Sequence, residues 1–290
     1  MSTESTDRGR FTQASPGIEA RLRSHAQVRS LGLEGNAMEL DSLGYTVVPE
    51  AAPPELFDRL REAILDVTAK VDARCPERVN FGPNTSMVYR LLAEDAVFTE
   101  AVLSPKLTAL VTYLLGEGYV SQVATGSVLG PGSYPGPLHA DNQFFPDPFP
   151  PQVHVATAIW CCDDFSAENG STHVVPASNQ RFRHPRPGEG VDDAVPVVAP
   201  RGSIVIWTGH TWHRSGGRTA EGERVALHTG FSRPHIRPFE AYTPEEIERL
   251  VAIDERFVRL VGADLPYECT DDTPDVTKLL ALAMTTQAQS

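Results

Sequence analysis

Three residues from two distant segments have the types and the spacing of a metal site. His139 and Asp141 are separated by one residue, and His213 comes from a later segment. Side chains at positions i and i+2 of a β-strand point to the same face, so this imidazole and carboxylate can bind one ion together. A second imidazole completes three ligands and leaves other coordination positions open, as in the 2-His-1-carboxylate sites of non-heme Fe(II) oxygenases. The pattern predicts His139, Asp141 and His213 as metal ligands and catalytic residues.

Two further polar residues, Ser215 and Arg224, follow His213 in the same part of the sequence. Arg224 opens a strand-like pattern eleven residues later. Its planar guanidinium can bind a carboxylate through two charge-assisted hydrogen bonds. Ser215 lies two residues after His213, so on a continuing strand its hydroxyl would share a face with that ligand.

His210 is the competing ligand, because it lies only three residues before His213. Strand alternation points it away from the His213 side, unless the turn at Gly209 re-aims it. The spacings of Ser215 and Arg224 favour His213. His210 then either lines the pocket or makes a structural hydrogen bond.

Three blocks of the sequence resemble the phytanoyl-CoA dioxygenase family of Fe(II)/2-oxoglutarate oxygenases. They are PLHADNQFF (137–145), DDFSAENGSTHVVPAS (163–178) and RGSIVIWTGHTWHRSGGRTAEGERVAL (201–227). The resemblance extends over about residues 40 to 235. It departs at Ala177, where the family usually has glycine, and at Asn179, where it usually has histidine.

The resemblance implies that His139, Asp141 and His213 bind Fe(II) and that Arg224 pairs with the distal carboxylate of 2-oxoglutarate. Ser215 is assigned as a second contact to that carboxylate, and Thr172 as a further co-substrate-binding residue. The implied reaction uses O2 as the other co-substrate and releases succinate and CO2. Related halogenases have a small residue in place of the carboxylate ligand, so Asp141 argues against halogenation.

The remaining pattern predicts a mainly β domain with flanking helices. Residues 44–49 read as a strand, a helix begins near Pro54, and a second helical stretch covers about 95–115. Thr243, Pro244 and Glu246 form a helix-starting capping box. Short segments rich in Val, Ile, Thr and Trp, bounded by turn residues, predict antiparallel strands at 120–129, 153–162, 171–177, 194–199, 202–208 and 223–232.

The expected fold is a double-stranded β-helix, a cupin-like jelly roll of two antiparallel sheets with helices on one side. Such a fold can bring together strands that are far apart in sequence. Residues 1–17 are expected to be disordered or frayed, and residues 18–290 to form a single domain. Segments 73–90 and 179–193 and the C-terminal helix are expected to cover the substrate, and this helix could also pack across a homodimer.

Composition narrows the class of partner. The net charge of -13 and the pI near 5.1 disfavour nucleic acid and anionic membranes, which would repel the protein. No signal-peptide h-region and no 18-residue apolar run is present. The four cysteines lack zinc-site spacing. We therefore expect a cytoplasmic enzyme with reduced thiols that acts on a small molecule.

Several conspicuous side chains have a structural and a functional interpretation. Phe144, Phe145 and Phe149 could wall an apolar pocket or pack in the core, whereas Trp160 and Trp207 are expected in the core. The sequence Glu168-Asn169-Gly170 predicts a turn in which Gly170 has a positive φ. The basic cluster of Arg181, Arg183, His184 and Arg186 could meet an anionic substrate, but a solvated loop is the simpler interpretation.

The predicted function is oxidation, most simply hydroxylation, of a small and largely apolar metabolite such as a natural-product or terpenoid-like scaffold. Desaturation, epoxidation and ring closure use the same chemistry, and the sequence does not separate them. The alternatives are an acyl-CoA hydroxylase of the same family, a non-catalytic metal-binding jelly-roll sensor, and a zinc hydrolase with the same ligands.

Overall fold

The computed structural model describes residues 16–78 and 82–265 of the chain. Residues 1–15, on which most of the predicted frayed terminus falls, lie outside the described residues. Pro16 and Gly17, the last two residues of that prediction, begin the first helix, α1 (Pro16–Ser30).

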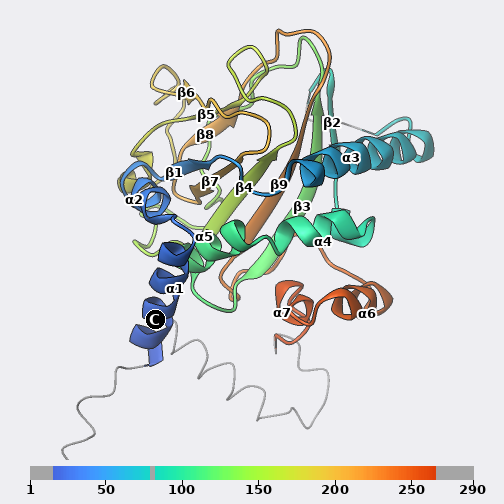
Figure 1. Ribbon diagram of the computed structural model, residues 1–290. Helices are drawn as coiled ribbons and strands as arrows, with labels where there is room; N and C mark the ends of the chain where they lie inside the picture. The colour runs from blue at the N-terminus through green and yellow to red at the C-terminus, as the bar shows by residue number, and fades with distance from the viewer. Residues whose placement is uncertain (1–15, 79–81, 266–290) are drawn as a thin grey trace, which may run out of the picture.

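A large antiparallel sheet forms the centre of the fold (Figure 1). Its strand order is β1-β7-β4-β9-β3-β2, and a smaller sheet has the order β6-β5-β8. This two-sheet arrangement confirms the predicted jelly roll. The bounds are β1 (Tyr45–Val48), β2 (Thr85–Val88), β3 (Val120–Leu129), β4 (Val155–Cys161), β5 (Thr172–Val174), β6 (Val195–Pro196), β7 (Ile204–Thr208), β8 (His213–Ser215) and β9 (Arg224–Ser232).

Alternation along the strands gives the large sheet two different faces. In β4, Ala158 and Trp160 pack with the helices on the outer face. Their neighbours Ile159 and Cys161 pack on the inner face, against residues such as Val174 of the small sheet. Each strand therefore supplies one set of side chains to the helical layer and the alternate set to the interior between the sheets.

Helices cover the outer face. Figure 1 shows α3 (Pro54–Arg74), α4 (Ala96–Val102) and α5 (Pro105–Leu115) lying across this face of the sheet. Leu56, Phe57, Leu60 and Ile64 of α3 are buried there, and the Phe57 ring lies 5.5 Å from that of Trp160. The apolar spacing that predicted α3 is thus the spacing that packs it on the sheet.

Two predictions about the helices need correction. The prediction of one continuous helix over 95–115 is wrong, because the segment forms two helices, α4 and α5. Pro105 disfavours the helical conformation at the preceding residue, and Ser104 is accordingly extended, with ψ 133°. The helices α1 and α2 (Glu34–Leu43) were not predicted, since their apolar residues follow no clear helical period.

The C-terminal described region contains α6 (Pro244–Ile253) and α7 (Phe257–Leu260). The Thr243 side chain accepts from the Glu246 backbone N–H, and the Glu246 carboxylate accepts from the Thr243 N–H. The predicted capping box is confirmed, and it fixes where α6 begins.

Candidate metal centre and co-substrate site

The three predicted metal ligands lie together on the inner side of the jelly roll. One ligand atom from each of His139, Asp141 and His213 lies within 4.8 Å of the other two. Asp141 Oδ1 is 3.6 Å from His139 Nε2 and 3.5 Å from His213 Nε2. Backbone hydrogen bonds in both directions between residues 139 and 213 join the two segments. The cluster is therefore held by main-chain pairing.

The second nitrogen of each imidazole is already used. His139 Nδ1 lies 2.9 Å from the Pro137 carbonyl oxygen, and His213 Nδ1 lies 3.0 Å from that of Thr211. A carbonyl can only accept, so each Nδ1 carries a proton, and Nε2 is left as the nitrogen that can bind a metal. Burial is the main reason that the pKa of His213 lies below its ordinary value. Both features suit neutral imidazole ligands of a divalent metal.

Asp141 is oriented by two donors that leave one carboxylate oxygen open. Thr157 Oγ1 and Trp207 Nε1 donate to Oδ2 at 2.7 Å and 2.9 Å. Burial alone would raise the pKa of Asp141, but the two imidazoles and these hydrogen bonds outweigh it and hold the pKa below its usual range. The group is an anion whose Oδ1 faces the imidazoles, and the donor set fits Fe(II).

Arg224 presents unused donors inside the protein. It is 3% exposed, and Nη2 donates to the Gly170 carbonyl at 2.9 Å. Its buried Nε and Nη1 have no acceptor among the described residues, and the guanidinium lies 4.6 Å from the Phe165 ring centre. Burial lowers the pKa of Arg224 to about 10, so it stays charged near neutral pH. A buried cation with free N–H groups needs an anionic partner, and the distal carboxylate of 2-oxoglutarate fits.

His210 does not belong to the cluster. It is 3% exposed, its Nε2 lies 3.0 Å from the Pro150 carbonyl oxygen, and its ring packs on Phe149 and Phe182. The structural interpretation of His210 therefore agrees with its surroundings.

The two weaker co-substrate residues lie opposite each other on neighbouring strands. Thr172 of β5 pairs with Ser215 of β8. Thr172 is buried, whereas Ser215 is exposed and its Oγ accepts from the Gly136 N–H at 3.0 Å. Among the described residues neither side chain bonds to Arg224, so their roles stay predictions.

Four other inner-face residues were not predicted as part of the site. Thr157 and Trp207 orient Asp141. Trp207 is also buried in the inner core, which confirms its predicted place, but its bond to Asp141 was not predicted. Ser127 Oγ lies 2.8 Å from His228 Nε2, and burial, aided by the Arg224 charge, lowers the pKa of His228 to about 3. The alternation of Arg224, Ala226 and His228 along β9 was the sequence signal that could have placed this neutral imidazole on the inner face.

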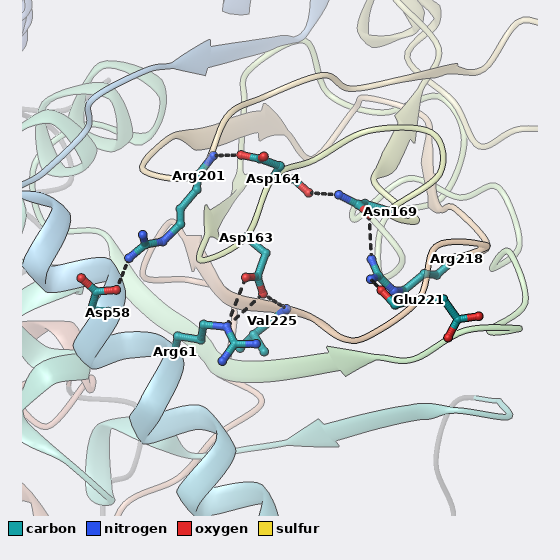
Figure 2. Close-up of polar contacts among 9 residues, drawn as sticks. All are labelled: Asp58, Arg61, Asp163, Asp164, Asn169, Arg201, Arg218, Glu221 and Val225. Atoms are coloured by element: carbon teal, nitrogen blue, oxygen red, sulfur yellow. Dashed lines mark hydrogen bonds and ion pairs between the residues drawn. The ribbon is translucent and has the colours of Figure 1, made fainter.

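Figure 2 shows a polar network around Val225, the residue that follows Arg224 in the sequence. Asp163 accepts from the Val225 N–H at 2.7 Å and from Arg61 Nε at 3.1 Å. Arg218 Nη1 donates to Asn169 Oδ1 at 2.9 Å. The predicted turn at Gly170 is confirmed, with φ +69°. These contacts fix the main chain on both sides of the Arg224 guanidinium.

The remaining candidates have mainly structural surroundings. Phe149 is buried beside Trp212, and Phe145 packs on His154. Phe144 is 68% exposed, and its ring lies 5.4 Å from that of Phe239 at a tilt of 40°. Trp160 is buried in the outer core, as predicted.

The basic cluster is internally paired. Arg183 makes two hydrogen bonds to Glu189 at 2.6–2.7 Å, and Arg181 lies 3.5 Å from the same carboxylate. Both guanidiniums also stack on Trp212. The cluster is thus partly neutralised, in agreement with the simpler interpretation.

The fold and the site match one family of enzymes. The model of the phytanoyl-CoA dioxygenase (PhyH) family matches residues 40–226, more than half of the chain. The chain belongs to this family. Dioxygenase af480 of Aspergillus fumigatus is 28% identical over 245 residues, which cover 81% of this chain and 79% of that protein.

Two solved structures share the fold of this PhyH family member. One is SnoK, a non-heme α-ketoglutarate-dependent carbocyclase from nogalamycin biosynthesis. Its TM-score is 0.57 at 18% identity, and the match covers 69% of this chain and 84% of the SnoK chain. HygX of Streptomyces hygroscopicus, solved with nickel and 2-oxoglutarate bound, has a TM-score of 0.55 at 16% identity, and the match covers 69% and 87% of the chains. Identities this low show the fold alone.

Membership of the PhyH family makes the protein a non-heme Fe(II)- and 2-oxoglutarate-dependent dioxygenase. The predicted family, enzyme class and cofactors are confirmed, and O2 is the second co-substrate. The sensor and zinc-hydrolase alternatives do not agree with this membership. Among the described residues, no helix combines the length and apolar character needed to cross a membrane.

Proposed function

We propose that this PhyH family enzyme oxidises, most simply by hydroxylation, a small and largely apolar metabolite such as a natural-product or terpenoid-like scaffold. The observation that carries the proposal is a pair of features in the interior between the two sheets. Three ligand atoms lie within 4.8 Å of one another, and a buried guanidinium offers free N–H groups. Together they suit a metal and a dicarboxylate co-substrate.

His139, Asp141 and His213 would hold Fe(II) through Nε2, Oδ1 and Nε2. Iron bound there would supply the redox chemistry of the family, in which 2-oxoglutarate is converted to succinate and CO2 as O2 is reduced. Arg224 would bind the distal carboxylate, and Thr172 and Ser215 remain candidates for further contacts to the co-substrate. Thr157 and Trp207 would keep the Asp141 carboxylate in one orientation.

Exposure of the ligands suggests where the substrate approaches. The His139 side chain is 47% exposed, whereas that of His213 is 7% exposed. We therefore propose that the substrate binds on the His139 side. Arg224 and the co-substrate would lie deeper in the interior between the two sheets.

The substrate class rests on the neighbours and on the paired basic cluster. SnoK comes from nogalamycin biosynthesis, and HygX has been solved with hygromycin B bound. Because Glu189 pairs with both Arg181 and Arg183, it cancels one of their two charges and weakens the site they could offer to the phosphates of an acyl-CoA. A natural-product scaffold is thus favoured over a thioester.

The cytoplasmic location of the enzyme and its assembly as a homodimer are proposed from the sequence. The charge of -13 and the buried free thiols of Cys161 and Cys162 support a cytoplasmic enzyme that does not act on nucleic acid. A homodimer remains a prediction, which size-exclusion chromatography with light scattering would test.

A substrate panel tests the proposal. Terpenoid and polyketide scaffolds and acyl-CoA thioesters would each be incubated with enzyme, Fe(II), 2-oxoglutarate and O2, with succinate and product mass as readouts. We expect succinate release coupled to the gain of one oxygen atom by a scaffold. Coupling only with thioesters would replace the proposed substrate class, and loss of two hydrogens would indicate desaturation.

A further inference from the structure

We propose that Arg218 is a positioning residue for 2-oxoglutarate. Together with Asn169 it fixes both the main chain that carries Arg224 and the carbonyl group that orients the Arg224 guanidinium. The inference rests on the proposed role of Arg224 in binding the distal carboxylate, and it explains why Arg224 keeps free donors pointed at one place.

A single Arg218 guanidinium joins two separate loops. Its Nη2 donates to the Glu221 carbonyl at 2.6 Å and its Nε to the Gly222 carbonyl at 3.2 Å, both in the loop that leads into β9. Its Nη1 donates to the Asn169 side chain at 2.9 Å, in the loop that leads into β5. Arg218 is only 5% exposed. Two nitrogens of this planar group brace the loop that contains Arg218, and Nη1 crosses to the other loop. The crossing bond adds to main-chain bonds between the same loops, such as that from the Thr219 N–H to the Glu168 carbonyl.

The main chain of Arg218 is anchored as well. Its N–H donates to Ser133 Oγ at 3.1 Å, and its carbonyl accepts from the Gly132 N–H at 2.9 Å. The side chain therefore starts from a fixed position, which a guanidinium needs if it is to hold other groups in place.

Gly170 connects this junction to Arg224. Its carbonyl accepts from Arg224 Nη2 at 2.9 Å. Its φ is +69°, and a Cβ at this position would lie 3.1 Å from the Arg218 backbone nitrogen. The loop therefore needs glycine here, and the close approach to Arg218 determines the direction of the Gly170 carbonyl.

The backbone of Arg224 is fixed independently of its side chain. Arg224 pairs with Leu129 in the sheet, and the next residue, Val225, donates its N–H to Asp163. An arginine side chain on a fixed backbone still has several rotatable bonds, whose freedom is costly to remove. Among hydrogen-bond acceptors of the described residues, the Gly170 carbonyl is the one that restrains the guanidinium.

The charge of Arg218 adds to this effect. Burial is the largest cause of the lowered pKa of Arg224. Repulsion from the positive charge of Arg218 lowers this pKa further. Two neighbouring cations raise the positive potential around Arg224, and this potential attracts a dianion such as 2-oxoglutarate.

The same network contains a natural control. Figure 2 shows Arg201 and Asp58 paired at its other end. The bond from Arg201 to Asp164 uses the backbone N–H, so Arg201→Gln removes the ion pair with Asp58 and keeps that bond. Arg201 makes no contact with Gly170 or Arg224 among the contacts of the described residues.

The test compares two ligands that differ only at the distal end. In 2-oxopentanoate a methyl group replaces the distal carboxylate of 2-oxoglutarate. Binding of each ligand to the anaerobic Fe(II) protein would be measured by calorimetry. The proteins compared are wild type, Arg218→Lys, Asn169→Ala, Arg201→Gln and Arg224→Ala. Thermal unfolding of each variant reports on general damage, and Asn169→Ala replaces Arg218→Lys if the latter does not fold.

We expect Arg218→Lys and Asn169→Ala to weaken 2-oxoglutarate binding about tenfold, as is common for residues that support a site from outside. Binding of 2-oxopentanoate should stay unchanged, and Arg201→Gln should behave as wild type. An equal effect on both ligands, or none, would overturn the inference. If Arg224→Ala leaves the preference for 2-oxoglutarate intact, the proposed function of Arg224 fails instead.

Discussion

The two faces of the large sheet are built from alternate residues of the same strands, yet they differ in kind. On the outer face, Trp160 and Leu227 pack with apolar side chains of α3 and α5. On the inner face, Thr157 and Arg224 direct polar groups toward the ligand cluster and the co-substrate end. The outer face packs against the helices and forms the larger core. The inner face carries Arg224 N–H groups that have no acceptor among the described residues. Substitutions at neighbouring positions of one strand should therefore differ in effect: those on the outer face should change stability, and those on the inner face should change catalysis.

The largest expected effect comes from removing a metal ligand of the cluster that lies against the inner face. His139→Ala should reduce O2-dependent succinate formation to the background rate, because two remaining ligands hold Fe(II) poorly. The side chain is half-exposed, so the unfolding free energy of the metal-free protein should change by less than about 1 kcal/mol. Normal succinate release by this variant would remove His139 from the site.

The next largest effect is expected at the co-substrate end. Arg224→Ala should cost about 2–5 kcal/mol of 2-oxoglutarate binding, which is roughly a 30-fold or greater rise in Kd. Affinity for Fe(II), measured in parallel without co-substrate, should stay near the wild-type value. Equal 2-oxoglutarate affinities in the two proteins would contradict the proposed role of Arg224.

The matching outer-face variant should show the opposite pattern. Leu227, three residues along the same strand, is fully buried among the helical residues. Leu227→Ala should lower the unfolding free energy by about 2–5 kcal/mol, because it leaves a cavity. Below its melting temperature the variant should bind 2-oxoglutarate as wild type does. A large loss of co-substrate affinity would show that the two faces are not independent.

A smaller effect should separate the metal ligands from the groups that orient them. Thr157→Val removes the hydroxyl that donates to Asp141 with little change in shape. Affinity for Fe(II), followed by competition with a chelator, should fall about tenfold. Unchanged affinity would mean that Trp207 alone fixes the carboxylate.

The sequence predicted the metal cluster because its information is local. The two-residue spacing of His139 and Asp141 identified them as a pair. The expected strand is absent there, because residues 139–141 form an isolated bridge at His139 and a bend, and His213 begins β8 of the small sheet instead of continuing β7. The jelly roll then brings the segments together, as the main-chain bonds between residues 139 and 213 show. A family resemblance supplied the role of Arg224, which spacing alone would have left as one basic residue among many.

The contacts missed by the sequence analysis depend on loops and on neighbouring strands. Trp207 was assigned to the core because a buried tryptophan is usually packed there, and its N–H partner comes from a distant segment. Arg218 bonds mainly to backbone carbonyls of irregular loops, which leave no periodic signal. The break at Pro105 could have been predicted, since proline disfavours a helical residue before it.

The most direct test of the central claim is an anaerobic titration of the metal-free protein with Fe(II) and then with 2-oxoglutarate, followed by visible absorbance. The site described above predicts a weak charge-transfer band that appears only after both additions and saturates at one equivalent of co-substrate per site. It should be absent in His139→Ala and should need far more 2-oxoglutarate in Arg224→Ala. If the wild-type protein binds Fe(II) but gives no band with 2-oxoglutarate, these residues do not form a co-substrate site.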